Sequence, residues 1–231
     1  MRAHYKFWPK RLPHAITLPV TSLWDNLETN ARRYPNKAAL VFFGTVLTYI
    51  QLLQKSEQLA QCLRGLGVEK GDRVVLCMQN CPQLVIAHFA ILRANAVVVP
   101  VNFIYRRGEL QHIFSDSGAR AFIGHRDHLA EAMPVIESLP EMGILVAEGE
   151  DAPAGFTPLP ELFDHSRDSV PYAATAAGDP FAIIYTSGTT GLPKGAVLTH
   201  GNLMSDVLSV SGLRSSEPGD VVISALPLFH I

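Results

Sequence analysis

The sequence has few cysteines and no long apolar run, and each shortage excludes a class of protein. Its three cysteines, Cys62, Cys77 and Cys81, are an odd number without the paired spacing of a zinc site. Cys62 lies in a helical pattern and Cys77 in a strand-like one, so we expect buried, reduced thiols and a cytoplasmic protein. The apolar stretches are interrupted well short of the ~20 residues that a transmembrane helix needs.

Charge is also scarce, since only 17% of the residues are charged and the formal net charge is −2. This balance gives no reason to expect a nucleic-acid partner. Hydrophobic residues make up 48% of the chain instead, which favours a sheet buried on both faces. The basic and aromatic N-terminus lacks the apolar core of a secretory signal. We predict a disordered or docking arm over residues 1–20, and the alternative is peripheral membrane contact through Phe7 and Trp8.

Segments of strand and helix pattern alternate along the chain. We expect helices at residues 22–34, 48–66, 80–94, 107–117, 126–138 and 202–213. We expect strands at residues 38–43, 72–78, 96–101, 119–124, 143–146, 181–185, 196–199 and 221–224. Ser22, Thr48 and Asn80 are the expected N-caps, with Pro82 near the start of its helix. The alternation indicates an α/β fold of wound, mostly parallel sheets flanked by helices.

A change of composition at residues 148–180 suggests a boundary, because this stretch is rich in Pro, Ala and Gly. We predict a first α/β subdomain over residues 21–147 and a connection over 148–180 with one short helix near 159–165. Residues 181–231 would then begin a second, incomplete α/β subdomain that carries a phosphate loop.

The phosphate-loop prediction rests on residues 185–195, which hold four Ser/Thr hydroxyls, three glycines and one lysine. Glycine lets backbone N–H groups converge on an anion, hydroxyls donate to phosphate oxygens, and Lys194 supplies a positive charge. The order of residues differs from the mononucleotide P-loop, because Pro193 precedes the lysine and a strand-like run follows it. The alternative is a surface turn rich in Ser, Thr and Gly.

The segment 186–195 resembles the phosphate-binding signature of the adenylate-forming superfamily, which includes acyl-CoA synthetases, firefly-type luciferases and adenylation domains of peptide synthetases. Residues 47–52 resemble the family's Leu-Thr-Tyr-x-Glu-Leu element, with Gln51 in place of Glu. Residues 92–102 resemble its Val-Pro-Val-Asn strand, with Asn95 where Gly is common. Residues 226–230, Leu-Pro-Leu-Phe-His, resemble the segment that lines the acyl pocket.

The resemblance implies an enzyme that uses ATP and Mg²⁺ to turn a carboxylic acid into an acyl-adenylate and then transfers the acyl group to CoA. It most resembles the fatty-acid type, acting on a medium- or long-chain acid. Lys194 would neutralise phosphate charge, and the metal's carboxylate ligand would lie outside this chain. His230 would orient the acid or gate the thiol, or else simply pack at a strand end. The expected phosphate cradle is Thr186, Ser187, Gly188, Thr189, Thr190 and Gly191.

Because members of this family are longer, the resemblance implies an N-terminal portion that is inactive alone. Two alternatives remain open at this point. The chain could be a non-catalytic domain that binds phosphate weakly, or it could belong to an adenylation domain that loads a carrier protein. Nothing in the sequence predicts the oligomeric state.

Several polar residues have simpler interpretations than catalysis. We read His200 and Asn202 as a structural turn and a helix cap. His125 and His128 fit a solvated helix start better than a zinc site, because no further ligand lies nearby in the sequence. Arg106 and Arg107 could contact phosphate, although a solvated helix N-terminus is the simpler interpretation.

Overall fold

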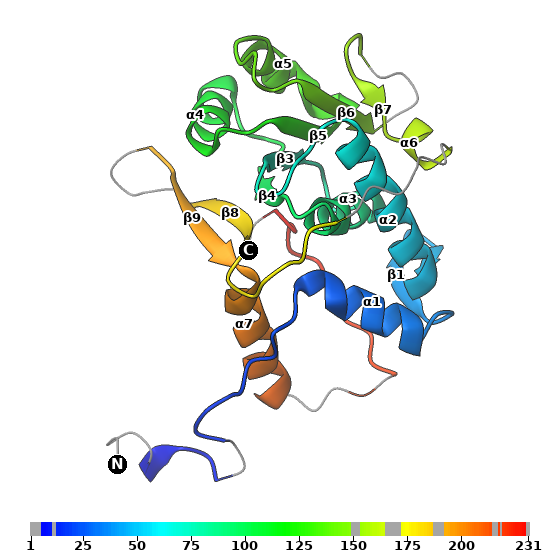
Figure 1. The fold of residues 1–231 in the computed structure, drawn as a ribbon, viewed down its shortest axis with the longest axis vertical. Helices are drawn as coiled ribbons and strands as arrows, with labels where there is room; N and C mark the ends of the chain where they lie inside the picture. The colour runs from blue at the N-terminus through cyan, green and yellow to red at the C-terminus, as the bar shows by residue number, and fades with distance from the viewer. Residues whose placement is uncertain are drawn as a thin grey trace.

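A computed structural model describes residues 6–10, 13–148, 153–164, 172–186, 192–213, 217 and 219–229. Within them, a seven-stranded sheet runs through the molecule in the order β7-β6-β5-β3-β4-β8-β9 (Figure 1). Its strands are β3 (Arg73–Cys77), β4 (Val97–Pro100), β5 (Ala121–His125), β6 (Ile144–Glu148), β7 (Thr157–Pro158), β8 (Pro180–Thr186) and β9 (Lys194–Thr199). All neighbouring pairs are parallel except β8 and β9, which are antiparallel.

The central strands are apolar on both faces, as the sequence predicts for a sheet covered from two sides. Side chains alternate along a strand, so Val74 and Leu76 enter one hydrophobic cluster while Val75 and Cys77 enter another. Burial raises the pKa of the Cys77 thiol to about 12, which keeps it protonated. The expectation of a buried, reduced thiol is confirmed at this position.

Helices cover both faces of the sheet. On one face lie α1 (Leu23–Arg33), α2 (Tyr49–Gly65) and α3 (Pro82–Arg93), which share a cluster with the sheet. On the other lie α4 (Arg107–Ser117) and α5 (Leu129–Glu137), the latter entered through the 3₁₀ turn η2 (Arg126–His128) (Figure 1). The predicted wound α/β fold is therefore confirmed. The short helix α6 (Glu161–Asp164) and the helix α7 (His200–Leu213) complete the described helices.

Two of the three predicted N-caps are present. Ser22 accepts from the Asp25 amide at 3.3 Å while its own amide donates to the Asp25 carboxylate at 2.6 Å. Thr48 and Gln51 make the same reciprocal pair, so Gln51 performs the capping role that Glu performs in a typical capping box.

The prediction for Asn80 is wrong. Cys81 is the N-cap of α3 and no side chain caps the helix, although Pro82 does occupy its first turn as expected. Proline has no N–H to be capped, which lowers the need for a side-chain acceptor at this end. The amide of Asn80 is used elsewhere, as described below.

A small hairpin outside the main sheet is an element that the sequence analysis missed in part. The predicted strand 38–43 is present as β1 (Ala38–Phe42), but it pairs antiparallel with an unpredicted partner, β2 (Thr45–Thr48). Phe43 and Gly44 connect them with φ angles of 44° and 83°. Two successive positive φ angles are typical of the tight turn that matches strand twist.

The predicted strand at residues 221–224 is also wrong, because these described residues form no strand. Val221, Val222 and Ile223 are instead exposed at 83% or more. A run of β-branched residues needs a neighbouring strand to pair with, and the described residues bring none to this segment.

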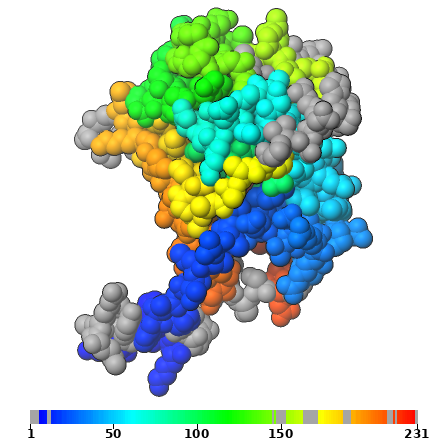
Figure 2. Space-filling view, viewed as in Figure 1, coloured from blue at the N-terminus to red at the C-terminus, as the bar shows by residue number. Residues whose placement is uncertain are grey.

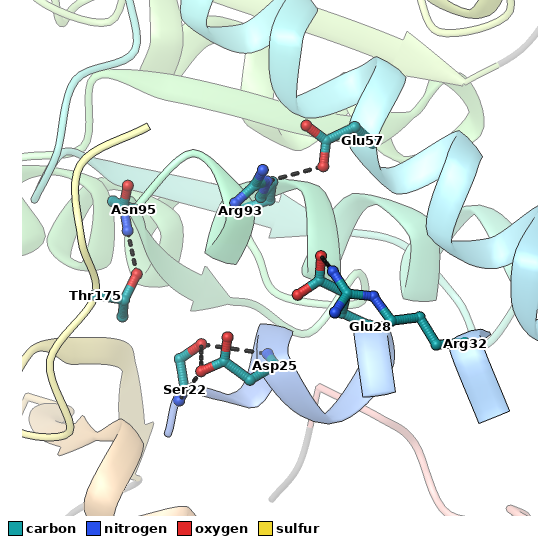
Figure 3. Close-up of polar contacts among 8 residues, drawn as sticks. All are labelled: Ser22, Asp25, Glu28, Arg32, Glu57, Arg93, Asn95 and Thr175. Atoms are coloured by element: carbon teal, nitrogen blue, oxygen red, sulfur yellow. Dashed lines mark hydrogen bonds and ion pairs between the residues drawn. The ribbon is translucent and has the colours of Figure 1, made fainter. Parts of the chain in front are cut away.

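Polar and stacking contacts fix the connection after α6 against the helices. Figure 3 shows the Arg93–Glu57 and Asn95–Thr175 pairs. The Arg93 Nε lies 2.8 Å from a Glu57 carboxylate oxygen, which joins α3 to α2. The Arg93 guanidinium also lies over the ring of Tyr172, 3.8 Å from its centroid, and Asn95 hydrogen-bonds to Thr175. Strands that precede the connection and strands that follow it belong to the same sheet. The division of the chain into two α/β subdomains stays a prediction.

Residues 13–20 lead away from α1 and are exposed, as the space-filling view in Figure 2 shows for this end of the chain. Among the described helices, none combines the length and the apolar character needed to cross a membrane.

Candidate functional site

The carboxyl edge of the main sheet is the candidate site. The strands β3, β4, β5 and β8 are parallel, so their carboxyl ends meet at one edge. The chain passes from β3 to β4 on one side and then crosses back to β5 on the other side of β3. Ligands of open α/β sheets bind in the crevice formed where the strand order reverses in this way.

The hairpin of β8 and β9 brings two of the predicted phosphate ligands to this edge. Thr186 is the last residue of β8 and Lys194 the first of β9, and they are direct cross-strand partners. Both are exposed, so a hydroxyl and an ammonium group are available to an anion at the mouth of the hairpin. The other five predicted cradle residues lie outside the described residues: Ser187, Gly188, Thr189, Thr190 and Gly191.

Gly195 lies in the paired part of this hairpin, where it leaves room for a neighbouring ring. It lies opposite Tyr185 in the β8–β9 register. A Cβ at Gly195 would come within 2.7 Å of the Ile183 Cγ2 atom and 3.0 Å of the Tyr185 Cζ atom. The lack of a side chain therefore lets the Tyr185 ring lie across β9, which is a packing reason for the glycine.

Two side chains of α4 contact the hairpin on either side of its loop. The Tyr185 hydroxyl donates to an Asp116 carboxylate oxygen at 2.6 Å. The Nε2 atom of His112 lies 2.7 Å from the carbonyl oxygen of Pro193. Burial, and then the neighbouring Asp116 carboxylate, raise the pKa of Tyr185, so its phenol stays protonated and remains a donor.

The segment that resembles an acyl-pocket wall is held at the carboxyl end of β3. The side-chain amide of Asn80 donates from Nδ2 to the Leu226 carbonyl at 2.8 Å. Its Oδ1 accepts from the Leu228 amide, also at 2.8 Å. One side chain thus makes two backbone hydrogen bonds to a segment nearly 150 residues further along the chain, an arrangement that otherwise occurs between paired strands. His230, two residues later, lies outside the described residues.

An aromatic stack completes this end of the crevice. Phe229 meets the ring of Phe103 edge-on with the centroids 5.6 Å apart, and Phe103 lies 4.7 Å from the His128 ring. Burial, and then the nearby His125, lower the pKa of His128, which favours the neutral ring. Its Nε2 lies 3.0 Å from the Gln79 side-chain nitrogen and, when neutral, can accept from it. His128 is therefore half-buried and packed here, which differs from the solvated helix start that the sequence predicts.

The remaining polar candidates make structural contacts. Arg106 pairs with Glu131 at 3.0 Å, and the Arg107 amide donates to the same carboxylate, so α4 and α5 are joined at this point. The buried His200 accepts from the Leu23 amide through Nδ1 at 3.2 Å. Asn202 accepts from the Thr199 amide, which is a capping contact at the start of α7.

Two surface clefts lie away from the hairpin, at α1 and its neighbours. The larger, about 560 Å³, is lined by side chains of α1 and α2, and the smaller, about 260 Å³, includes Arg93 and Tyr172. Because α3 ends just before β4 begins, Arg93 lies toward the amino edge of the sheet. We place the candidate site at the carboxyl edge, because Thr186 ends β8 there and Lys194 lies opposite it.

The signals for Thr186 and Lys194 are local, whereas those for the supporting residues are not. Tyr185 and Asp116 are 69 residues apart, and His112 and Pro193 are 81 apart. Sequence reasoning missed both pairs because only the topology of the sheet brings them together. Within the described residues, no group of three or more His, Cys, Asp or Glu side chains could hold a metal ion.

Comparison with known proteins gives consistent matches. Residues 27–231 match the sequence model of a family described as AMP-binding enzyme. The chain is 34% identical to a long-chain-fatty-acid–CoA ligase of Yersinia pestis, over 98% of this chain and 46% of that protein. It is 38% identical to a feruloyl-CoA synthase of an Amycolatopsis species, over 87% of this chain and 38% of that protein.

Among solved structures, a long-chain-fatty-acid-CoA ligase from Archaeoglobus fulgidus superposes with a TM-score of 0.82 at 27% identity. The match covers 94% of this chain and 44% of that one. The chain therefore spans about half the length of the relatives it matches, or less.

Proposed function

This chain belongs to the AMP-binding enzyme family, and from that premise we propose that the whole protein is an ATP-dependent acid–CoA ligase. The observation that carries the proposal is the meeting of Thr186 and Lys194 at the carboxyl edge of the sheet. A hydroxyl and a cation at the mouth of one hairpin suit a polyphosphate. The Asn80-bound segment 226–229 lies beside the same edge, where it could wall the acid.

The reaction has two steps. A carboxylate oxygen attacks the α-phosphorus of ATP, the bond to pyrophosphate breaks, and an acyl-adenylate forms. The sulfur of CoA then attacks the acyl carbon, its proton is lost and AMP leaves. Joining the acid to AMP removes the negative charge that makes a carboxylate a poor electrophile. The main work of the protein is to orient the two reactants and to stabilise the departing pyrophosphate.

The roles of the chain's residues follow from this chemistry. Thr186 to Gly191 would donate to phosphate oxygens, and Lys194 would neutralise charge on the pyrophosphate. His230 would orient the acid or control the approach of the thiol. Mg²⁺ would reduce the repulsion among phosphate oxygens, and those oxygens would supply ligands that the described side chains do not.

The proposed acid is a medium- or long-chain fatty acid. The Yersinia and Archaeoglobus relatives are named for long-chain fatty acids, and Leu226 and Phe229 offer apolar surface at the crevice. The Amycolatopsis relative is named for ferulic acid, an aromatic substrate, so the panel of acids to be tested includes both kinds. We also propose a cytoplasmic location, supported by a buried Cys77 that forms no disulfide. Peripheral membrane contact through the exposed Phe7 is the alternative to a docking role for the N-terminal arm.

The proposal is tested by replacing Lys194 and Thr190 with alanine, one at a time, in the whole protein. Removal of one group that stabilises developing charge costs about 10²–10³ in rate. We expect losses of that order in acid-dependent exchange of pyrophosphate into ATP. Lys37→Ala, an exposed lysine before β1, is the control and should leave exchange unchanged. Unchanged exchange in both test variants would contradict the assignment.

The same preparation tests whether the acyl group is transferred to CoA or to a carrier protein. Consumption of CoA together with formation of an acyl-CoA supports the ligase. Acyl-adenylate formation with no use of CoA would favour an enzyme that loads a carrier protein. The 231-residue chain, assayed alone, is the comparison for the non-catalytic alternative.

A further inference from the structure

We propose that α4 is a brace for the phosphate-binding hairpin, with His112 and Asp116 as positioning residues that act through Pro193 and Tyr185. The inference rests on the proposed function, since it names residues that hold the loop of that same site. Neither side chain is proposed to touch the nucleotide. Their role is to fix the two ends of the loop relative to each other.

The two contacts bracket the loop. Tyr185 immediately precedes Thr186, and its hydroxyl is held by Asp116 at 2.6 Å. Pro193 immediately precedes Lys194, and its carbonyl is held by His112 at 2.7 Å. The chain leaves β8 and enters β9 between these points, so both ends of the loop are attached to one rigid helix. Fixing the ends of a loop in advance lowers the entropy lost when a ligand orders it.

The spacing of His112 and Asp116 along α4 supports the inference that they act together on the hairpin. His112 and Asp116 are four residues apart on α4, so they project from the same face of the helix. The ring of His112 lies 6.2 Å from that of Tyr185 at an interplanar angle of 86°, which joins the two contacts into one packed group. Gly195 completes it, because a side chain there would collide with the Tyr185 ring.

The residues that contact the hairpin are different from those that anchor α4 to the sheet. Leu110, Ile113 and Phe114 anchor α4 to the sheet and are at most 2% exposed. Asp116 is exposed, and His112 is only partly buried. Substitution of either bracing residue should therefore leave the fold intact and change only the position of the hairpin.

The chemistry of the contacts dictates which variants should rescue. Pro193 offers a carbonyl, so His112 must donate through Nε2, and Gln can donate through its own amide nitrogen. Tyr185 donates, so Asp116 must accept, and Asn can accept through its carbonyl oxygen. We expect His112→Gln and Asp116→Asn to retain function that His112→Ala, Asp116→Ala and Tyr185→Phe lose.

Kinetics in the whole enzyme give the first test. Because small misplacements of reacting groups are costly, we expect kcat/KM for ATP in pyrophosphate exchange to fall about tenfold in the Ala and Phe variants. The KM for the acid should change little, and both rescue variants should stay near wild type. Ser115→Ala is the matched control, since this exposed neighbour on α4 contacts Gln111 and not the hairpin.

Hydrogen exchange on the same proteins, without ligand, gives the second test. Backbone amides of residues 183–186 and 194–197 should exchange faster in the Ala and Phe variants and at the wild-type rate in Ser115→Ala. Equal exchange and equal kcat/KM in all variants, with unchanged melting temperatures, would overturn the brace. If the wild type lacks pyrophosphate exchange but the Ala and Phe variants still show faster amide exchange in the hairpin, the proposed function is wrong. The positioning role of His112 and Asp116 is then still supported. If an Ala variant is unfolded, Tyr185→Phe, which removes one hydroxyl, decides the question.

Discussion

At the scale of single residues, Asn80 shows how one side chain can replace a strand. Its amide pairs with the backbone on both sides of Pro227, donating to Leu226 and accepting from Leu228. Proline cannot donate to a sheet ladder, which makes this segment a poor strand. Two side-chain hydrogen bonds therefore do the work of strand pairing and keep the segment beside β3.

We expect Asn80→Asp to be more harmful than Asn80→Ala for use of the acid in the whole enzyme. The aspartate would turn an acceptor oxygen toward the Leu226 carbonyl, whereas alanine only removes the two bonds. The KM for the acid should rise more than the KM for ATP, because the segment lies at the proposed acyl side of the crevice. Each lost neutral hydrogen bond should cost about 0.5–1.5 kcal/mol of stability, measurable by urea unfolding.

Gln83→Ala, a change in the first turn of α3, is the control for these measurements. Equal rises in the KM values of acid and ATP, or no rise in either, would count against a positioning role for Asn80.

At the residue scale, the sequence proposes members of the candidate site only where their signal is local. Thr186 and Lys194 belong to one short motif, and their hydroxyl and charge point to phosphate without a structure. Asn80 was misassigned because Asn shortly before Pro is a common cap signal, while its actual partners lie 146 and 148 residues away. No sequence pattern reports contacts of that separation.

At the scale of elements, a histidine of α3 and one at the start of α7 make stability depend on pH. The His88 pKa is lowered from 6.5 to about 4 by burial and then by the charge of His200. Burial also lowers the pKa of His200, while Asp179 and Asp25 oppose that shift. Both groups bind a proton more readily in the unfolded chain. Above pH ~6.5 these two groups therefore do not change the free energy of unfolding. As the pH falls toward ~4 they lower that free energy progressively.

We expect the free energy of unfolding to decline between pH 6.5 and 4.5 in urea titrations of the purified chain. His88→Gln, which cannot take up this proton, should flatten the decline. His14→Gln in the exposed arm should leave the profile unchanged. A wild-type profile that stays flat over this range would contradict the prediction.

Elements with a strong pattern were predicted well, and short or unpartnered ones were not. The helices α1, α2 and α4 and the buried strands β3 to β6 have long periodic or apolar runs, so burial and propensity agree. β7 holds only two residues, too few for a pattern to be visible. β2 is as long as β4, but none of its residues is fully buried, so it lacks the apolar run that marks a strand of the core. The run 221–224 has strand propensity but no partner in the described residues, and propensity alone does not make a strand.

At the scale of the whole molecule, one edge of the sheet is open to solvent among the described residues. β9 is the last strand of the order, and Val197 on it is 57% exposed. Val207 and Val210 on the following helix α7 are 40% and 47% exposed. An edge strand next to apolar surface is a template for association with another chain.

We expect the purified 231-residue chain to self-associate, with a mass by light scattering that rises with protein concentration. Val197→Lys should reduce the effect, because a charge on an edge strand opposes pairing with a second edge. Val75→Ile, in the buried centre of β3, should not relieve it. A monodisperse monomer at all concentrations would contradict the prediction.

The order of strands across the sheet has a consequence for how the protein is made. β8 pairs with β4, although β5, β6 and β7 come between them in the chain. As the chain leaves the ribosome, β3 to β6 can pair before β8 and β9 emerge. The edge of β4 that pairs with β8 therefore stays unpaired until β8 has been synthesised. Translation speed over residues 101–179 therefore affects how long a nascent chain exposes that edge of β4 to chaperones. Among the described strands, the β8–β9 hairpin is the last to be synthesised.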